Sequence, residues 1–486
     1  MKSGKTVSGM EFYALAYGLF LGLTILKFGN PVILDGKITP PASFSEFWND
    51  PWPTHWANWI LPPLVLVGAA IVFSRKMTWP GTKWLWLLPF LWFGWQLFSA
   101  TQTVDTNLTV TTLWQFFGCV AGYFLGAFLF GRERALRWLL IGVLAAFTFC
   151  LVRAIDQRLF EFPQSRQMLV EGERTNWTNI PPELFGEMKR ENVIITTNGL
   201  DVANPVILAK FGKEPPVNAN RLHRLFYKLF TPSPRVNGTL VYPNALAGAV
   251  LLLFPISLVF AFNSTKRLRP VIHAIVIALA FFLGGAGFLW TGSKLGWLIA
   301  VAIGGACLFR LKWATRLKWM ALTIVLLVGL GVFAVRFHNY FTAGATSVGA
   351  RFDYWRAAAQ TTLAHPLLGT GPGTFQRPYA QFKSPEAEMA RLTHNDYLEQ
   401  FSDSGIAGGI FYGAWILTAS TIIGRRIWNF GSPTAFAIFI GLLGWLAQGI
   451  GEFGLYIPAL AWTAFTLLGG LLGLSGNQID KSASAN

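Results

Sequence analysis

One short stretch of this sequence gathers the side chains best suited to chemistry. It reads RLTHNDYLEQFSDSGIAGG, residues 391–409, and it places His394 among amide and carboxyl groups close to a long apolar run. Because histidine side chains ordinarily titrate near neutral pH, His394 is a candidate general base for a hydroxyl nucleophile. The acidic residues that follow raise the separate question of a cation site, and they are Asp396, Glu399 and Asp403.

A metal site is disfavoured by the neighbours of these acids. Arg391 and His394 precede them, and the chain has no HExxH sequence, no paired cysteine ligands and no dense aspartate cluster. We therefore expect neither a metal nor any other cofactor. The glycine-rich GTGPG, residues 369–373, follows no clear strand and opens no Rossmann-type helix. It predicts a turn at which the backbone approaches another segment closely.

Three further polar clusters carry cations. They are RVNGTLVYPNALAG with Arg235 and Asn244, TGSKLGW with Lys294, and ARFDYWRAAA with Arg351 and Arg356. Any single one of these cations could be an interfacial side chain that extends to water. Together they predict a cationic surface without matching carboxylates, and arginine and lysine suit phosphate oxygens. A lipid diphosphate would supply the missing negative charge.

The composition requires a membrane around these clusters. The 486 residues are 53% hydrophobic and only 13% charged, which is unusual for a soluble domain. A membrane-spanning helix needs roughly 20 apolar residues. We therefore predict an all-α polytopic membrane protein with about twelve transmembrane helices, at 11–29, 58–74, 83–100, 110–130, 136–155, 237–262, 270–290, 292–309, 319–336, 405–424, 434–452 and 455–474.

The short connections alternate in charge. Lysine and arginine concentrate in every second connection, and such residues are retained on the cytoplasmic side. Both ends of the sequence and the basic connections are therefore predicted to be cytoplasmic, while the polar clusters face outward. The net charge of +16 is in part this topological signal, and we do not expect nucleic-acid binding.

Two long polar segments divide the predicted helices. The expected organisation is a five-helix membrane segment at 1–155, a first large external segment at 156–236, a four-helix segment at 237–336, a second external, catalytic segment at 337–404, a three-helix segment at 405–474 and a cytoplasmic tail at 475–486. Within the first external segment, RLHRLFYKLF (221–230) has the apolar spacing of a helix lying in the lipid interface. A lid helix packed on the other external segment is the alternative.

The ordered clusters resemble the O-antigen ligase/polymerase superfamily. His394-Asn395, then nine residues, Gly405, two residues and Gly408 match the ligase signature. Arg351-x-x-x-Trp355 followed by HPLLGTGPGTF is similar to the family's Arg/Trp segment and Pro/Gly-rich turn. RVNGTLVYPNALAG is similar to its Arg-Gly-Thr…Pro-Asn helix entry. The family usually has arginine where this chain has Lys294.

This resemblance implies a C-type glycosyltransferase-like fold and metal-independent, inverting glycosyl transfer at the periplasmic face of the bacterial inner membrane. The donor would be an undecaprenyl-diphosphate-linked glycan, and the acceptor lipid A-core or another glycan. His394 would activate the acceptor hydroxyl, while Arg351 would hold the diphosphate and stabilise its developing charge. The further donor- or glycan-binding candidates are Arg235, Lys294, Arg356, Asn395, Asp396 and Asn244.

The residues leave several functions open. A ligase, a polysaccharide polymerase and a protein oligosaccharyltransferase would share this site and differ in their acceptor. A polyprenyl-glycan transporter or flippase is the alternative of a different class. Coupled transport usually needs ionisable residues in the middle of the spans, and these are nearly absent.

Overall fold

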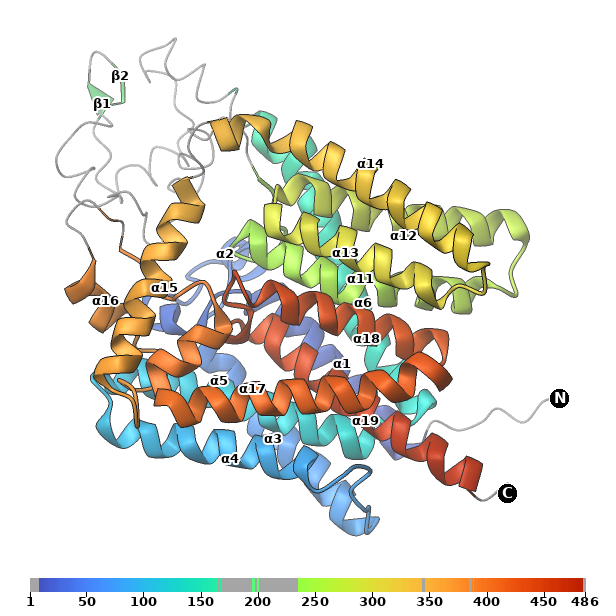
Figure 1. Cartoon of the computed structure of the whole chain (residues 1–486), viewed down its shortest axis with the longest axis horizontal. Helices are drawn as coiled ribbons and strands as arrows, with labels where there is room; N and C mark the ends of the chain where they lie inside the picture. Colours follow the sequence, from blue (N-terminus) through green and yellow to red (C-terminus); the bar gives the residue numbers. More distant parts are fainter. Residues whose placement is uncertain are drawn as a thin grey trace.

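The computed structural model describes residues 8–164, 167, 195–196, 199–200, 235–342, 346–383, 387 and 389–483. Within these ranges the chain forms an array of long helices that run side by side (Figure 1). Most of the predicted external segment 156–236, including the predicted interfacial helix 221–230, lies outside the described residues.

Each of the twelve predicted apolar ranges overlaps a helix, although the range 237–262 begins before a helix that starts at Pro243, and the range 434–452 runs past a helix that ends at Gln448. Nine of the helices found in the described residues are long and apolar enough to cross a membrane. This confirms a polytopic helical membrane protein, and the count of twelve crossings stays a prediction. The helices over the twelve ranges are α1 (Gly9–Lys27), α3 (Thr54–Ser74), α4 (Trp84–Ser99), α5 (Thr106–Leu129), α6 (Glu133–Asp156), α11 (Pro243–Thr265), α12 (Pro270–Thr291), α13 (Lys294–Arg310), α14 (Thr315–Thr342), α17 (Asp396–Phe430), α18 (Pro433–Gln448) and α19 (Pro458–Ala483).

Shorter elements connect these helices. They are α2 (Phe44–Asn49), α15 (Thr346–Ala364), α16 (Gln376–Phe382), 3-10 turns at Val32–Lys37, Ala100–Gln102 and Gly454–Tyr456, and a π-helical turn at Gln157–Glu161. Two-residue strands β1 (Ile195–Thr196) and β2 (Gly199–Leu200) pair antiparallel, with Ile195 opposite Leu200. The polar range 337–404 therefore contributes two helices, α15 and α16, which lie at one end of the array (Figure 1).

The tightest helix packing depends on glycines. Where α1 crosses α6, a Cβ added to Gly18 would lie 2.3 Å from the Leu139 carbonyl oxygen, and one added to Gly142 would lie 2.4 Å from the Gly18 carbonyl carbon. Small residues let helix backbones approach closely in a membrane, where dispersion contacts replace the hydrophobic effect as the source of helix association. The same device joins α5 to α19, because a Cβ on Gly469 would lie 1.9 Å from the Tyr123 carbonyl oxygen.

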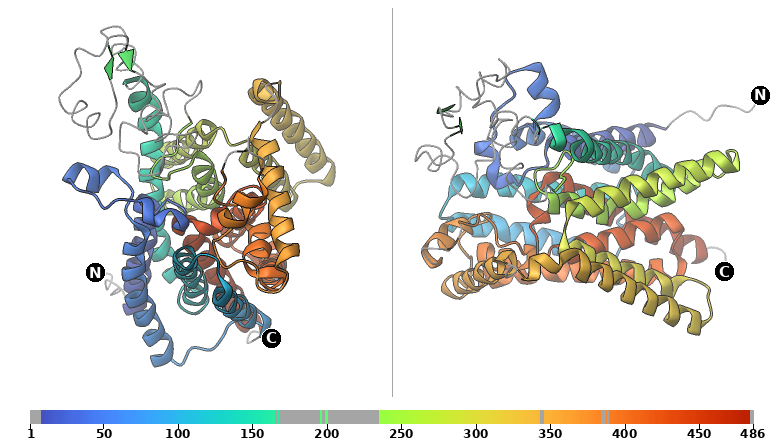
Figure 2. Two further views of the ribbon diagram at one scale, coloured as in Figure 1. Left: turned by 90° about the vertical axis from the view of Figure 1, so that its left-hand side faces the viewer. Right: turned by 90° about the horizontal axis from the view of Figure 1, so that it is seen from above.

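The outer helices are exposed in a way that a soluble protein would not tolerate. Helix α14 packs mainly against α13 and leaves large apolar side chains uncovered, including Leu327 at 69% and Val335 at 82% exposure. Figure 2 shows the α13 and α14 pair at the edge of the array. Such a surface is stable next to lipid chains.

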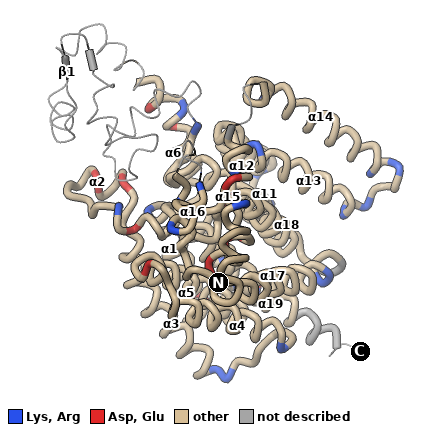
Figure 3. The backbone as a smooth tube through the Cα atoms, turned by 60° about the vertical axis from the view of Figure 1, so that its left-hand side comes forward, with Lys and Arg blue, Asp and Glu red and all other residues tan. Residues whose placement is uncertain are grey.

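Three connections at one end of the array carry basic residues. Figure 3 shows lysine and arginine at the connections between α3 and α4 and between α13 and α14, and near the end of α17. Helix α1 begins and α19 ends at the same end, opposite the end that carries α15 and α16 (Figure 1). That this end is cytoplasmic stays a prediction from the charge of the connections.

The glycine contact between α1 and α6 predicts a specific sensitivity. Gly142→Ala should lower the stability of the purified protein in detergent by about 1–3 kcal/mol, because the added methyl group has no space. Thermal unfolding followed by size-exclusion fluorescence measures this change. Gly94→Ala is the matched control, since a Cβ at Gly94 meets nothing within 4 Å. Equal unfolding midpoints for both variants would contradict this account of the packing.

Candidate active site

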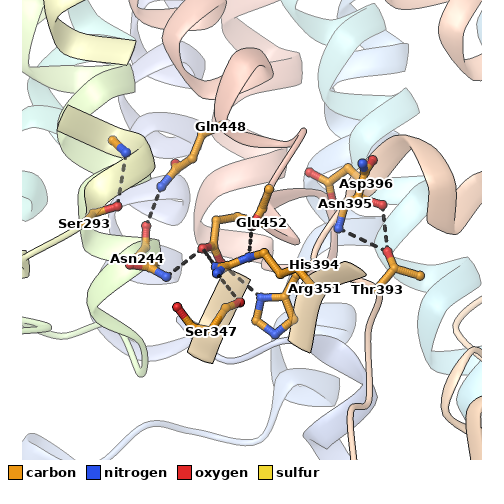
Figure 4. Close-up of polar contacts among 12 residues, drawn as sticks. Asn244, Ser293, Ser347, Arg351, Thr393, His394, Asn395, Asp396, Gln448 and Glu452 are labelled. Atoms are coloured by element: carbon orange, nitrogen blue, oxygen red, sulfur yellow. Dashed lines mark hydrogen bonds and ion pairs between the residues drawn. The ribbon is translucent and has the colours of Figure 1, made fainter. Parts of the chain in front are cut away.

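The site is organised around one carboxylate. Glu452 lies in the connection between α18 and the 3-10 turn Gly454–Tyr456, and its side chain is only 10% exposed. Its Oε1 atom accepts hydrogen bonds from Arg351 Nη2 at 2.5 Å and from Asn244 Nδ2 at 2.6 Å. Its Oε2 atom lies 3.4 Å from His394 Nδ1. These side chains point toward one another in Figure 4.

The connection that carries Glu452 is tied to the start of α17. The backbone N–H of Asp396 donates to the Gly449 carbonyl at 2.8 Å. The backbone N–H of Leu455 in turn donates to both carboxylate oxygens of Asp396 at 3.1 Å. These bonds hold both ends of the turn and place Glu452 next to His394. His394 lies two residues before the start of α17.

Arg351 joins α15 to the same connection. Its Nε donates to the Gly451 carbonyl at 3.0 Å, and its Nη1 donates to the Ser347 carbonyl at 3.1 Å. The guanidinium is therefore held in a fixed orientation, and Nη2 is the nitrogen that faces Glu452. The sequence-based expectation that these cations lack a carboxylate partner is wrong for Arg351, because Glu452 comes from a distant part of the chain.

Arg235 reaches the site through Asn244. Its Nη2 donates to Asn244 Oδ1 at 2.5 Å, and its Nε donates to the Thr291 carbonyl. The backbone beyond Arg235 is held by Gln157, whose Oε1 accepts from the N–H groups of Asn237 and Gly238. Asn244 therefore links Arg235 to Glu452: its amide oxygen accepts from the cation, and its amide nitrogen donates to the carboxylate.

His394 has an unusual backbone and an aromatic setting. Its φ of +52° lies in the left-handed region, which costs free energy for a residue with a Cβ. The ring stacks on Tyr354 at 5.8 Å between centroids and meets Phe453 edge-on at 4.7 Å. An ionised carboxylate only accepts hydrogen bonds, so the contact with Glu452 requires a proton on Nδ1. In the neutral ring this leaves the Nε2 lone pair as the base.

Asn395 and Asp396 do not join this group. Asn395 caps α17, since its Oδ1 accepts from the N–H groups of Tyr397 and Leu398 at 3.0 Å. Asp396 is buried and bonded to Leu455, on the side away from His394 in Figure 4. In the structure both side chains position backbone around His394 and Glu452.

Lys294 lies at the edge of the site and Arg356 lies apart from it. Lys294 is the first residue of α13, and its Nζ is 3.7 Å from the centre of the Tyr340 ring. It is near enough to Arg235 and Arg351 for their charges to interact. Arg356 is exposed on α15, five positions after Arg351, so the two side chains leave the helix in directions about 140° apart.

The charges in the site are strongly perturbed by burial and by each other. Burial by itself raises the pKa of the Glu452 carboxyl, but the hydrogen bonds and charges of His394 and Arg351 outweigh it and hold this pKa below its usual range. Burial lowers the pKa of the Arg235 guanidinium, Glu452 opposes this change and Arg351 adds to it. The site therefore keeps an ionised carboxylate surrounded by a surplus of cations.

The GTGPG turn is confirmed as a close backbone approach. Gly369, Gly371 and Gly373 all have positive φ, and a Cβ on Gly369 would lie 2.3 Å from the backbone of Asp403. The Asp403 carboxylate accepts from the N–H of Gly373 at 2.6 Å. Glu399 likewise accepts from the N–H and hydroxyl of Thr393. These acids support the backbone next to the site.

No metal cluster is present in the part of the chain that the structure describes. Within those residues, no three His, Cys, Asp or Glu side chains form a group that could hold a metal ion. Asp396, Glu399 and Asp403 each accept hydrogen bonds from backbone N–H groups instead.

A family model supports the interpretation of these motifs. Residues 279–413 match the family described as O-antigen ligase, and this segment contains Lys294, Arg351 and His394. The match confirms the relation to the O-antigen ligase superfamily. Members of that superfamily are glycosyltransferase-type enzymes, ligases or polymerases, and the matched segment covers 135 of the 486 residues of the chain. A search of curated proteins finds no match to the chain.

Sequence reasoning missed the residue at the centre of the site. Glu452 lies in GEFGLYIP, and no local motif there predicts its contact with His394 and Arg351. A signal was available, because Glu452 stands where one predicted span ends and the next is about to begin, on the same predicted membrane face as His394. Tyr354 and Phe453, which hold the His394 ring, carry no comparable signal in the sequence.

The lowered pKa of Glu452 predicts a loss of stability in acid. Because the folded-state pKa lies below the ordinary value of 4.5, the stabilising contribution is complete above pH 4.5 and is lost as the pH falls through the folded-state pKa. Each unit of depression is worth about 1.4 kcal/mol. Thermal unfolding measured from about pH 7 to about pH 3 should show a smaller acid effect for Glu452→Gln than for the wild type. The same pH dependence in both would contradict this role.

Proposed function

We propose that this protein transfers a glycan from an undecaprenyl-diphosphate-linked donor to an acceptor hydroxyl at the periplasmic face of the bacterial inner membrane. The observation that carries the proposal is the convergence of His394, Arg351 and, through Asn244, Arg235 on the single carboxylate of Glu452. A base and two cations for an anionic leaving group are thereby gathered at one end of the helix array.

His394 is the general base in this proposal. Its Nδ1 faces Glu452, and the side chain is 30% exposed, so an acceptor hydroxyl can approach Nε2. Nε2 takes the hydroxyl proton as the oxygen attacks the anomeric carbon. The new carbon–oxygen bond forms on the face opposite the breaking bond to the diphosphate, and the transfer inverts the anomeric centre. Histidine bases contribute typically about 10²–10⁴-fold to such steps.

The arginines stabilise the leaving group. As the bond to the sugar breaks, negative charge grows on the diphosphate, and oriented guanidinium groups stabilise it without having to reorganise. Arg351 is held by the Gly451 and Ser347 carbonyls, and Arg235 by the Thr291 carbonyl. Lys294 adds a further positive charge nearby. Fixed cations thus take the role that a divalent ion has in many nucleotide-sugar enzymes, so the proposed transfer is independent of metal.

The direction of the site in the membrane follows from charge. The basic connections lie at the end of the array opposite α15 and α16, and basic connections are retained in the cytoplasm. This supports the proposal that Glu452 and His394 face the periplasm. Helices α12 and α14 expose apolar side chains along their length, which suits a donor whose polyprenyl chain stays in the bilayer.

The acceptor proposed first is lipid A-core, because the matching family model is described as O-antigen ligase. A growing glycan would make the protein a polymerase, and a protein hydroxyl would make it an oligosaccharyltransferase. The three activities share one site, so the transferred product distinguishes them.

Substitution of the base and of the cation tests the proposal directly. Purified protein is supplied with an undecaprenyl-diphosphate-linked oligosaccharide and with lipid A-core, glycan or peptide acceptors. His394→Ala should lower the transfer rate by about 10²-fold or more, and Arg351→Ala by a similar factor, because each removes a group that acts in the transition state. Product mass identifies the acceptor.

Two exposed side chains distant from Glu452 provide the matched controls. His365→Ala and Arg134→Ala should retain the wild-type rate, since both residues are exposed outside the group around Glu452. Wild-type rates in both the His394 and the Arg351 variants would overturn the proposed site. Abolition of transfer by a chelator, with recovery on adding a divalent ion, would overturn the metal-independent mechanism alone.

A further inference from the structure

Two residues of the proposed mechanism depend on the same carboxylate, and they share it unequally. Glu452 Oε1 is bonded to Arg351 Nη2 at 2.5 Å and to Asn244 Nδ2 at 2.6 Å, whereas Oε2 lies 3.4 Å from His394 Nδ1. An N–H···O bond is usually 2.7–3.2 Å long, so the histidine contact is the weak one. The cation and amide thus hold Glu452 more strongly than the base does.

The guanidinium of Arg351 leaves a particular nitrogen for an anionic ligand. Nε is committed to the Gly451 carbonyl and Nη1 to the Ser347 carbonyl, so Nη2 is the nitrogen that a phosphate oxygen would share with or take from Glu452. Phosphate competes well for guanidinium because it offers several anionic oxygens. The diphosphate and Glu452 are therefore competitors for Arg351.

We infer that Glu452 is a positioning residue that couples donor binding to activation of the base. When a diphosphate engages Arg351 Nη2, the carboxylate loses its strongest partner and bonds more strongly to His394 Nδ1. A carboxylate at Nδ1 fixes the tautomer and stabilises the imidazolium formed during proton transfer. His394 thus becomes a better base when the donor is in place. This inference rests on the proposed function and adds an order to it, donor before acceptor.

Donor binding can change the basicity of His394 in two ways, through Glu452 or directly through the charge of the diphosphate. The titratable groups that interact with Glu452 are Arg235 ahead of α11, Arg351 on α15, and His394 and Asp396 at the start of α17. Lys294 on α13 lies close to the two arginines. A bound diphosphate would also raise the basicity of His394 through its own charge. When Glu452 is replaced by neutral glutamine, the part of this increase in basicity that depends on the carboxylate is lost. The part caused directly by the diphosphate remains.

The pH dependence of transfer is the measurement that tests this coupling. At saturating acceptor, kcat/KM for the donor reports ionisations before the donor binds, and at saturating donor, kcat/KM for the acceptor reports those afterwards. In the wild type the acidic limb of the second profile should lie at higher pH, because imidazolium is stabilised once the donor is bound. In Glu452→Gln the separation between the two limbs should shrink to the part that the charge of the diphosphate causes directly, and kcat should fall on the order of 10²-fold or more.

Donor binding separates this role from simple loss of structure. Glu452→Gln should bind the donor at least as tightly as the wild type, since Arg351 no longer has a competing carboxylate. Glu452→Asp should recover part of the separation between the limbs, because it restores the charge. Glu133→Gln, an exposed glutamate at the start of α6, is the matched control and should change none of these quantities.

Failure of the inference about Glu452 gives a different result from failure of the proposed glycan transfer. If His394→Ala and Arg351→Ala abolish transfer while Glu452→Gln keeps the wild-type kcat and the wild-type separation of the limbs, this inference is overturned and the proposed function stands. A Glu452→Gln protein that binds the donor more weakly, with both limbs unmoved, would also overturn it, because Glu452 would then only support the fold. Active His394 and Arg351 variants would overturn the proposed function first.

Discussion

A buried carboxylate needs compensating partners, and this requirement organises the functional end of the molecule. Isolating an ionised Glu452 from water would be prohibitive, and pairing it with Arg351, Asn244 and His394 makes it tolerable. Arg351 comes from α15, Asn244 from α11 and His394 from the residues just before α17. Together with the turn that carries Glu452, four distant segments meet at one side chain, and the same contacts set the positions of the base and the cation.

The surrounding bundle keeps this arrangement rigid. Helix α17 is kinked at Gly405, whose φ is +71°, and the N–H of Ile406 donates to the Pro366 carbonyl of the segment after α15. Asp403 binds the GTGPG turn of the same segment through Gly373. The helix that begins beside His394 and the helix that carries Arg351 are consequently locked to each other on both sides of the site. A small displacement of either would separate the base from its carboxylate.

The helices could be predicted from the sequence because each apolar run has only one stable conformation in lipid. How they pack could not, since α1 against α6 depends on Gly18 meeting Gly142 across a long sequence separation. His394 and Arg351 were identified from their local patterns and family spacing. Glu452 was not placed in the site, because its contact with His394 spans 58 residues and depends on the folded path of the turn that carries it, which is bonded to Asp396. Asn395 and Asp396 were selected as neighbours of His394, yet the left-handed backbone at His394 and the helix starting immediately afterwards direct them elsewhere.

The distance along the chain between Arg351 and Glu452 has a consequence for biogenesis. The two partners are separated by 101 residues, and ribosomes add about 5–20 residues per second. Arg351 therefore emerges roughly 5–20 s before its carboxylate. During that interval the Arg351 guanidinium lacks the carboxylate that it contacts in the folded protein. Synthesis of α18 and the turn after it supplies Glu452, so the site is complete only after this late part of the chain has been made.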